Sequence, residues 1–364
     1  MKVNIIGDWF NSTGYANHTR QFAIALNKLV SITVTTNKNP NWTSLVTDEE
    51  YKMLSGNADD CDVNIMIGMP QYWRSWSVRD KPFIGFCVWE GNKVPKDWFK
   101  NMIDENVKQI WVPSLHTRTA IINTIKEFDG FDMVLKKIRI VPHGVNTDIF
   151  KYDITKKQKP FIFTANKGWR GGWLDRGGLA FLFKSFNEEF SIEDNVELLV
   201  KINSVYAQIN LQDEMNKLKL LENRAPIKIT PENLSYEMLP QFYSTGDVFI
   251  SPSMAESYNL PCIEAMSCGI PVITSDFGGQ TDYVSNVNGW LLKEGELFEV
   301  KHEIMYEGIS WVRPSNTELR RVMRYVYNNR DEVKSKGLLA LETAKNNTWN
   351  HSAKIALDSL NELI

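Results

Sequence analysis

Residues 249–284 read FISPSMAESYNLPCIEAMSCGIPVITSDFGGQTDYV, a strand, a turn and a helix that carry two glutamates. The apolar residues 248–250 predict a buried strand, and Pro261 suits the first turn of a helix, because that position needs no N–H donor. Glu256 is therefore expected in the turn before the helix, and Glu264 about one turn into it. Both carboxylates can then point into one site at the helix N-terminus.

The start of this helix offers hydrogen-bond donors. The backbone N–H groups of Tyr258, Asn259 and Leu260 have no partner within a helix that begins there, and such groups suit a phosphate. The segment is therefore predicted to hold an anion at the start of a helix that ends at Gly269.

Apolar runs alternate with amphipathic stretches along most of the chain, which predicts an α/β architecture with parallel sheets. In the first half, strands are expected at residues 3–6, 31–35, 63–67, 83–88, 110–113 and 138–142. In the second half, they are expected at residues 161–165, 197–202, 227–229, 248–251 and 271–274. The clearest helices are expected at residues 17–29, 179–190, 315–333 and 349–363. This pattern predicts two doubly wound domains, joined by the Lys-rich residues 151–160.

Length, charge and cysteine content limit the class of protein. A chain of 364 residues suits two domains of ordinary size. A net charge of -3 and a pI near 6.0 give no overall attraction to nucleic acid or to anionic lipid. No signal peptide or transmembrane segment is predicted, so a cytoplasmic location is expected. Four cysteines lack the spacing of metal ligands and are expected to be reduced core residues: Cys61, Cys87, Cys262 and Cys268.

The segment around the two glutamates resembles one known family. The order of Glu, seven residues and Glu, continuing as EAMSCGIPVITSDFGG, is similar to the retaining GT-B glycosyltransferases of family 4, the glycosyl transferases group 1 type. That family usually has Gly, Phe and Gly after its first glutamate, where this chain has Ser257, Tyr258 and Asn259. Asparagine tolerates positive φ better than other non-glycine residues, so the loop is expected to keep the shape that it has in the family. The resemblance implies that Glu256 contacts hydroxyls of a donor sugar and that Glu264 binds a ribose.

The resemblance also implies an architecture and a donor. Two Rossmann-like domains with doubly wound parallel sheets would face a central cleft. Residues 1–150 would form the acceptor side, and residues 157–345 would bind a nucleotide-diphosphate sugar. The helix at residues 349–364 would cross back onto the N-terminal domain. No cofactor and no metal ion is expected.

A glycine-rich basic loop follows the first strand of the second half, where residues 161–178 read FIFTANKGWRGGWLDRGG. Cations are needed in such a site because a leaving nucleoside diphosphate gains negative charge as the glycosidic bond breaks. By the resemblance, Arg176 matches the second cation of the family, which is usually a lysine. The first cation is either Lys167 or Arg170, because the loop is longer than in the family.

Five further residues stand where the family contacts its ligands or at the ends of predicted strands. Gly14 matches a glycine that approaches donor and acceptor, and Thr230 follows a strand that lies near the nucleotide base in relatives. Glu90 takes the place of a histidine that touches the donor sugar in many relatives. His116 and His143 are either sugar contacts or hydrogen-bonded structural residues.

Two patterns are interpreted as structural. Asp60-Cys61-Asp62 has the form of a D-x-D metal motif, but it precedes a strand and lacks the context of the fold that uses this motif, so we interpret it as a loop. Tryptophans are frequent in the N-terminal half, and core packing is preferred to stacking on sugars or bases for Trp42, Trp73, Trp76, Trp89 and Trp98.

The residues and the resemblance together predict a metal-independent, retaining glycosyltransferase. It would move a hexose from a donor of the UDP-glucose or GDP-mannose type to a hydroxyl of a carbohydrate or another acceptor. One alternative is a phage-type glucosyltransferase acting on a modified DNA base, which the acidic pI disfavours. Another is a non-catalytic nucleotide-sugar binding protein of the same fold, which the combination of Glu256, Glu264 and Arg176 disfavours.

Overall fold

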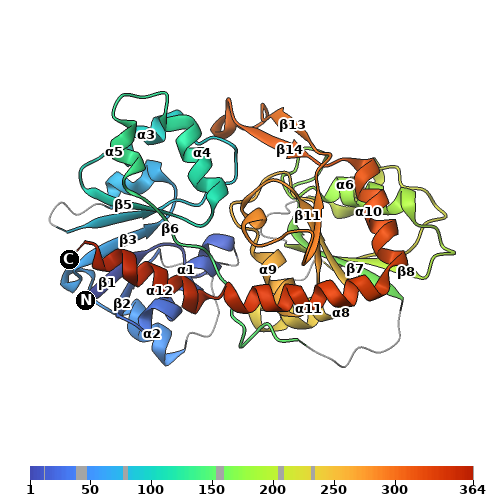
Figure 1. Cartoon of the computed structure of the whole chain (residues 1–364), viewed down its shortest axis with the longest axis horizontal. Helices are drawn as coiled ribbons and strands as arrows, with labels where there is room; N and C mark the ends of the chain where they lie inside the picture. Colours follow the sequence, from blue (N-terminus) through green and yellow to red (C-terminus); the bar gives the residue numbers. More distant parts are fainter. Residues whose placement is uncertain are drawn as a thin grey trace. The chain divides into compact units, whose positions relative to one another are not determined.

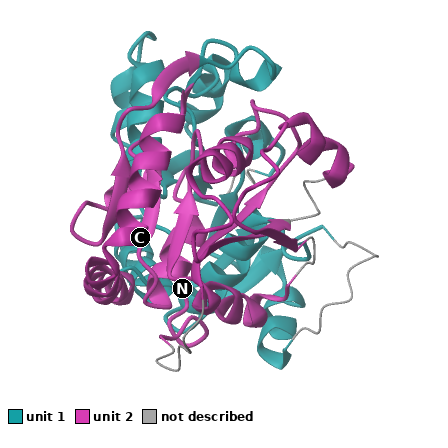
Figure 2. Ribbon diagram, turned by 90° about the vertical axis from the view of Figure 1, so that its right-hand side faces the viewer, with its two compact units in different colours: residues 1–144, 299–310, 347–364 teal, residues 145–298, 311–346 magenta. Residues whose placement is uncertain are grey.

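The computed structural model of the chain describes residues 1–11, 13–37, 47–76, 81–152, 160–203, 209–230 and 234–363. These residues form two compact units, which Figures 1 and 2 show. Unit 1 consists of residues 1–144, 299–310 and 347–364, and unit 2 consists of residues 145–298 and 311–346. Trp42 and the expected domain start at residue 157 lie outside the described residues.

Unit 1 is built on a six-stranded parallel sheet in the order β2-β1-β3-β4-β5-β6. Its strands are β1 (Lys2–Ile6), β2 (Ser31–Thr35), β3 (Val63–Ile67), β4 (Phe83–Phe86), β5 (Val107–Val112) and β6 (Ile138–Ile140). Its helices are α1 (Gly14–Asn27), α2 (Asp48–Leu54), α3 (Phe99–Met102), α4 (Leu115–Ile125), α5 (Phe131–Leu135) and α12 (Trp349–Asn361). Every residue of β3 is buried, as expected for a parallel strand covered on both faces. In Figure 1, α3, α4 and α5 lie on one side of the strands and α1, α2 and α12 on the other. The six strands predicted for the first half of the chain are confirmed.

Helix α1 begins earlier than the sequence pattern indicated. The hydroxyl of Thr13 accepts a hydrogen bond from the backbone N–H of Ala16 and so caps the helix. Gly14, which we expected in the loop after β1, is therefore the first residue of α1. Helix α12 packs against α1, and the ring of Trp349 stacks on that of His18 with 5.6 Å between the ring centroids.

Unit 2 is built on a second six-stranded parallel sheet, in the order β12-β11-β10-β7-β8-β9. Its strands are β7 (Phe161–Gly168), β8 (Val196–Asn203), β9 (Ile227–Thr230), β10 (Val248–Ser251), β11 (Val272–Ser275) and β12 (Gly289–Leu292). Its helices are α6 (Leu179–Glu189), α7 (Leu211–Lys217), α8 (Leu239–Thr245), α9 (Leu260–Ser267), α10 (Asn316–Asn328) and α11 (Arg330–Asn346). The five strands predicted for the second half are present, and β12 is an additional short strand.

The single helix expected at residues 315–333 is wrong. The chain forms two helices there, α10 and α11, because the backbone leaves the helical region at Asn329, where φ is -116° and ψ is 58°. Helix α11 continues well past residue 333 and lies against α9. A Cβ atom at Gly337 would lie 2.5 Å from the carbonyl oxygen of Gly269, so this glycine permits the close approach of the two segments. Much of the buried face of α11 consists of alanine and glycine, whose weak hydropathy pattern did not indicate a helix.

Several short elements were not predicted from the sequence. The strands β13 (Glu296–Glu299) and β14 (Ser310–Arg313) form a separate two-stranded sheet, and the residues of β13 are mostly exposed. Strands this short and this exposed carry little of the alternation on which sequence-based prediction depends. The short 3₁₀ helices are η1 (Ala58–Asp60), η2 (Pro70–Ser75), η3 (Lys96–Trp98), η4 (Tyr236–Met238), η5 (Gly279–Asp282) and η6 (Ile304–Tyr306).

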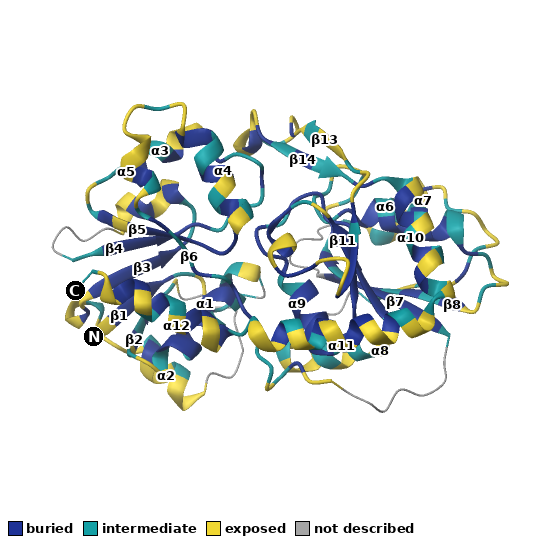
Figure 3. Cartoon of the chain, in the orientation of Figure 1, coloured by how far each residue is buried: buried dark blue, intermediate teal, exposed yellow. Residues whose placement is uncertain are grey.

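The strands of both sheets are largely buried, as Figure 3 shows. Trp73, Trp89 and Trp98 are fully buried, which confirms their interpretation as core residues, whereas Trp76 is 38% exposed. All four cysteines are buried and free, as predicted. Among the described residues, none of the helices combines the length and the apolar character that crossing a bilayer requires.

Two glycines between β7 and α6 allow a matched test of this backbone. Gly172 and Gly178 have φ values of 70° and 72°, where a side chain is strained. A Cβ atom at Gly178 would also lie 2.2 Å from the carbonyl oxygen of Pro252, whereas one at Gly172 would meet no atom within 4 Å. We expect Gly172→Ala to lower the free energy of unfolding by about 1–2 kcal/mol, and Gly178→Ala to lower it by about 1–3 kcal/mol more. Urea denaturation of both variants measures the difference, and equal losses would contradict the close contact with Pro252.

Candidate functional site

The turn between β10 and α9 has the predicted form. Asn259 adopts a left-handed conformation, with φ 69° and ψ 63°, and occupies the position before α9 begins at Leu260. Its side-chain amide donates to Ser251 Oγ at 2.9 Å, and the hydroxyl of Tyr283 donates to the carbonyl oxygens of Tyr258 and Asn259, both at 2.8 Å. The expected positive φ at Asn259 is thus confirmed, and side chains hold the turn at both of its ends.

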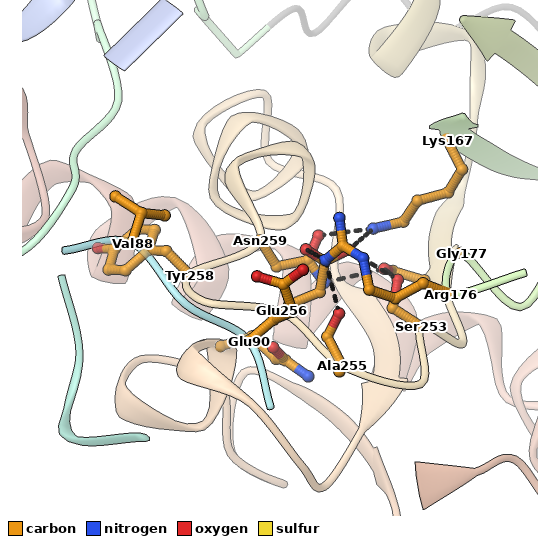
Figure 4. A network of polar contacts seen from close by, with 12 residues as sticks. Val88, Glu90, Lys167, Arg176, Gly177, Ser253, Ala255, Glu256, Tyr258 and Asn259 are labelled. Atoms are coloured by element: carbon orange, nitrogen blue, oxygen red, sulfur yellow. Dashed lines mark hydrogen bonds and ion pairs between the residues drawn. The ribbon is translucent and has the colours of Figure 1, made fainter. Parts of the chain in front are cut away.

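Glu256 lies in this turn between two cations, as Figure 4 shows. Lys167 Nζ lies 2.8 Å from Glu256 Oε1, and Arg176 Nη1 lies 3.3 Å from Oε2. The hydroxyl of Ser253 also donates to Oε1 at 2.9 Å, and Arg176 Nη1 donates to the carbonyl oxygen of Ala255 at 2.9 Å. The carboxylate is therefore fixed in position and paired with opposite charge.

The electrostatic effect of these contacts is large. Burial by itself would raise the pKa of the Glu256 carboxyl. The charges of Lys167 and Arg176, together with hydrogen bonds from Lys167 and Ser253, outweigh burial, and the pKa falls to about 2. Glu256 is therefore ionised throughout the neutral range.

The loop from β7 to α6 presents the two cations differently. Lys167, which we expected in the loop, belongs to the carboxyl end of β7, and its Nζ also donates to Asn259 Oδ1 at 2.9 Å. Asp175 organises the loop, because its carboxylate accepts the backbone N–H groups of Arg170 at 2.9 Å and Gly177 at 3.0 Å. The side chain of Arg170 is exposed. Of the two candidates for the first cation, the structure thus brings Lys167 to Glu256.

Glu264 lies in α9 in a different environment from Glu256. It is 4% exposed, and its Oε2 accepts a 2.7 Å hydrogen bond from the hydroxyl of Tyr243. That hydroxyl in turn accepts one from Asn166 Nδ2 at 2.9 Å. Burial raises the pKa of Glu264 to about 7, against the opposing effects of Tyr243, Lys201 and Lys167. Two carboxylates at the start of one helix therefore differ in charge state near neutral pH.

The remaining candidates of unit 2 line the same edge of its sheet. Thr230 is the last residue of β9 and pairs in register with Lys201 of β8. Tyr258 is buried and Leu260 is partly buried at the start of α9. The carboxyl ends of β7, β8, β9 and β10 thus contribute to one polar region, as the ends of parallel strands do in doubly wound sheets.

Glu90 of unit 1 is engaged by a residue that the sequence did not suggest. The hydroxyl of Tyr306 donates to Glu90 Oε1, and the Tyr306 ring stacks on that of Trp89 with 4.8 Å between centroids. His116 Nε2 lies 2.8 Å from the carbonyl oxygen of Glu90, and because a carbonyl only accepts, Nε2 carries the proton. The contact with Tyr306 spans 216 positions, so no local pattern could have indicated it.

The other two candidates of unit 1, His143 and Gly14, lie in or against helix α1. His143 is 4% exposed, its ring centroid lies 4.1 Å from that of His18, and burial lowers its pKa to about 3. Gly14 lies in the first turn of α1, and a Cβ atom there would meet no atom within 4 Å. A role for either residue in ligand binding stays a prediction.

The D-x-D pattern forms a turn, as interpreted from the sequence. Asp60 ends η1, and Asp62 accepts a 2.8 Å hydrogen bond from the backbone N–H of Lys2. Nowhere in the described ranges do three His, Cys, Asp or Glu side chains gather as a group that could hold a metal ion. Both aspartates therefore belong to the connection that leads into β3.

Comparison with known proteins bears on the segment that carries the two carboxylates. Residues 208–309 match the family model described as glycosyl transferases group 1. The matched segment contains both Glu256 and Glu264, so the resemblance inferred from their spacing is confirmed at the level of this family.

Curated relatives support the same family. A sucrose synthase from Melioribacter roseus is 23% identical over 271 residues, which are 62% of this chain and 34% of that protein. The capsular polysaccharide biosynthesis glycosyltransferase CapM from Staphylococcus aureus is 28% identical over 44% of this chain and 42% of its own length. A D-inositol 3-phosphate glycosyltransferase from Nocardia farcinica is 30% identical over 34% of this chain and 23% of that protein. The chain thus spans less than half the length of these relatives.

Solved structures show the fold. Sucrose-phosphate synthase from Thermosynechococcus elongatus superposes with a TM-score of 0.72 and 16% identity, covering 100% of this chain and 98% of that one. HepE from Anabaena, in complex with UDP and glucose, superposes with a TM-score of 0.67 and 14% identity over 100% of both chains. The two six-stranded parallel sheets therefore form a GT-B fold, as the sequence predicted.

The raised pKa of Glu264 predicts a pH dependence of stability. The unfolded carboxyl titrates near pH 4.5, whereas the folded one titrates near 7, so the folded state binds more protons between these values. The stability that this group contributes is complete below pH 4.5 and is lost as pH rises through 7. Glu264→Gln, which cannot ionise, should therefore gain stability relative to wild type by up to about 1.4 kcal/mol per pH unit from pH 5 to pH 7.

Urea denaturation at several pH values measures this gain, and Glu256→Gln is the matched control. Glu256 titrates near 2, so its substitution should destabilise the protein by the same amount across this pH range. A difference between wild type and Glu264→Gln that does not change with pH would contradict a raised pKa at Glu264.

Proposed function

We propose that this chain is a retaining glycosyltransferase that transfers a hexose from a nucleotide-diphosphate sugar, of the UDP-glucose or GDP-mannose type, to an acceptor hydroxyl. The observation that supports it is the grouping of Lys167 and Arg176 around Glu256 beside the N-terminus of α9. This group lies at the carboxyl edge of a parallel sheet, which is where open α/β sheets bind nucleotides. A helix N-terminus at such an edge is also suited to binding a phosphate.

The two cations would stabilise the leaving diphosphate. In a front-face transfer, the bond between the sugar C1 and the phosphate oxygen breaks while the acceptor oxygen bonds to C1 on the same face. The proton of the acceptor hydroxyl passes to the leaving phosphate oxygen, so no side chain has to act as a base. Negative charge builds up on the leaving diphosphate, and Lys167 and Arg176 supply the positive charge that stabilises it. The scheme uses neither a metal ion nor a cofactor.

Glu256 would orient the donor sugar. Its carboxylate is ionised at neutral pH and accepts hydrogen bonds from sugar hydroxyls. The ammonium of Lys167 has three N–H donors, and within the described part of the chain Glu256 and Asn259 use two of them. The third suits a phosphate oxygen, so one lysine can hold both the carboxylate and the diphosphate.

The rest of the donor would lie along the same edge of the sheet. Glu264 would bind the ribose, Thr230 would lie near the base, and the N–H groups at the start of α9 would face the phosphates. The acceptor is proposed only as a carbohydrate or another molecule with a hydroxyl. The four free, buried cysteines support a reducing compartment such as the cytoplasm as the place of action.

Donor binding can be tested before the acceptor is known. A ligand present at 100 times its dissociation constant stabilises a protein by about 2.7 kcal/mol. We therefore expect UDP, GDP or ADP, or one of their sugars, to raise the melting temperature in a thermal-shift screen. If none of these ligands changes the melting temperature, the proposal fails.

Substitution of Glu256 separates catalysis from binding. Glu256→Gln keeps the shape of the side chain but removes the charge that orients the sugar, so we expect turnover to fall by roughly 10²–10³-fold while nucleotide affinity changes little. Mass spectrometry of products and calorimetry with the nucleoside diphosphate measure the two effects. Glu197→Gln is the control, because Glu197 forms a 2.7 Å ion pair with Lys228 outside this cluster. Full turnover in Glu256→Gln would refute the assigned role.

A further inference from the structure

Lys201 is a buried lysine near Glu264 that the proposed function does not use. Lys201 is 4% exposed and lies near the carboxyl end of β8. Leu198, Val200 and Ile202 of the same strand pack into a hydrophobic core on one face of the sheet. Because side chains alternate along a strand, Lys201 projects from the opposite face.

The register of the sheet shows what surrounds Lys201 on that face. Lys201 pairs with Asn166 of β7 on one side and with Thr230 of β9 on the other. Side chains of registered neighbours in a parallel sheet project from the same face. Asn166 donates to the hydroxyl of Tyr243, which donates to Glu264. Lys201 therefore belongs to the polar region that contains the proposed ribose-binding carboxylate.

Lys201 and Glu264 are close enough to influence each other. Burial lowers the pKa of Lys201, and the negative charge of Glu264 opposes this effect. Among the described residues, however, no hydrogen bond or ion pair engages the Lys201 ammonium, and Glu264 accepts a hydrogen bond from Tyr243 alone. A buried cation and a buried carboxylate thus face one region without a direct bond between them.

The other buried lysines in the described part of unit 2 are hydrogen-bonded within the chain. Lys336, which is 8% exposed, donates to the carbonyl oxygens of Asn286 and Gly289, at 2.5 and 2.9 Å. Lys167 donates to Glu256 and Asn259. A buried ammonium is costly unless it is paired and hydrogen-bonded. Lys201 differs from these two lysines in lacking such partners among the described residues, which points to a ligand as its partner.

A hydroxyl group is the ligand group that suits both side chains. An ammonium only donates hydrogen bonds and a carboxylate only accepts them, whereas a hydroxyl does both at once. A hydroxyl between the two would accept from Lys201 and donate to the Glu264 oxygen that Tyr243 does not occupy. We propose that Lys201 is a further donor-binding residue, whose ammonium donates a hydrogen bond to a ribose hydroxyl that in turn donates one to Glu264. This inference rests on the proposed function, in which Glu264 binds the ribose.

Tyr243 and Asn166 have a positioning role in this arrangement. The hydroxyl of Tyr243 fixes one carboxylate oxygen of Glu264, and Asn166 fixes that hydroxyl. The second oxygen is thereby left to the ligand on the side of Lys201.

The test is Lys201→Met in the full chain, which keeps the length of the side chain and removes its charge. Calorimetry would measure the affinity for whichever of UDP, GDP and ADP binds wild type, and for its 2′-deoxy and 3′-deoxy forms. A hydrogen bond to a charged group is worth a roughly tenfold to hundredfold change in affinity, so the ribonucleotide should bind that much more weakly to the variant. The form that lacks the bridging hydroxyl should bind wild type weakly and should lose less than about threefold on the substitution.

Three further variants exclude a structural explanation. Lys336→Met removes a buried ammonium that is paired within the chain, so it should lower the melting temperature without changing the preference for ribose over its deoxy forms. Lys201→Met should keep or raise the melting temperature, since it removes a buried charge that no described residue pairs with. Lys201→Gln should show the same loss of ribose preference if Lys201→Met does not fold. The effects of Lys201→Met and Glu264→Gln on ribonucleotide affinity should not add, because one hydroxyl serves both side chains.

Two results distinguish the failure of this inference from that of the proposed function. One such result is that wild type and Lys201→Met bind the ribonucleotide equally. The same conclusion follows if the substitution weakens binding of the ribonucleotide and of both deoxy forms by the same factor. In either case Lys201 does not bind the ribose, and the proposed function stands. If wild type binds none of UDP, GDP and ADP and none of their sugars, the proposed function itself is refuted, and the inference falls with it.

Discussion

Charge compensation around the Glu256 carboxylate is the constraint on which the candidate site depends. The carboxylate lies in a turn that buries most of it, and such a carboxylate is stable only if it is paired and hydrogen-bonded. Lys167, Arg176 and Ser253 meet this requirement from two different segments of unit 2. The glycine-rich loop, the turn before α9 and the carboxyl end of β7 are thereby held together by one anion. A bound diphosphate would be a second anion beside the same two cations, so the site already holds the positive charge that such a ligand requires.

The contrast between Glu256 and Glu264 shows how one helix start supports two kinds of carboxylate. Cations surround Glu256, and its pKa falls to about 2, while Glu264 lies deeper, receives one hydroxyl donor, and has a pKa of about 7. The first is a permanent negative charge at neutral pH. The second changes its protonation state in the neutral range, so its charge depends on what binds next to it.

The sequence predicted the fold and the carboxylate half of the site because those features are local. The turn at Asn259, the helix that follows it and the positions of both glutamates depend on residues within one short segment. Of the two cations, Arg176 was predicted outright, whereas the first was predicted only as either Lys167 or Arg170. The contact between Lys167 and Glu256 spans 89 positions and depends on the order of strands in the sheet. Tyr243 and Lys201 were missed for the same reason. In the sequence they are ordinary helix and strand residues, and only the folded sheet places them near Glu264. Helix α11 was missed because small residues, which allow its close packing, also weaken its apolar pattern.

The composition of unit 1 has a consequence for how the protein folds during synthesis. Residues 347–364 complete unit 1, and all of unit 2 precedes them in the chain. Helix α12 covers α1, and Trp349 packs on His18, so the ribosome releases this covering helix only after every strand of unit 2 has been made. Until then, the apolar surface of α1 lacks its cover and is exposed to chaperones or to aggregation. Unit 2, whose parts are complete once residue 346 has been made, can fold first, although it comes second along the chain.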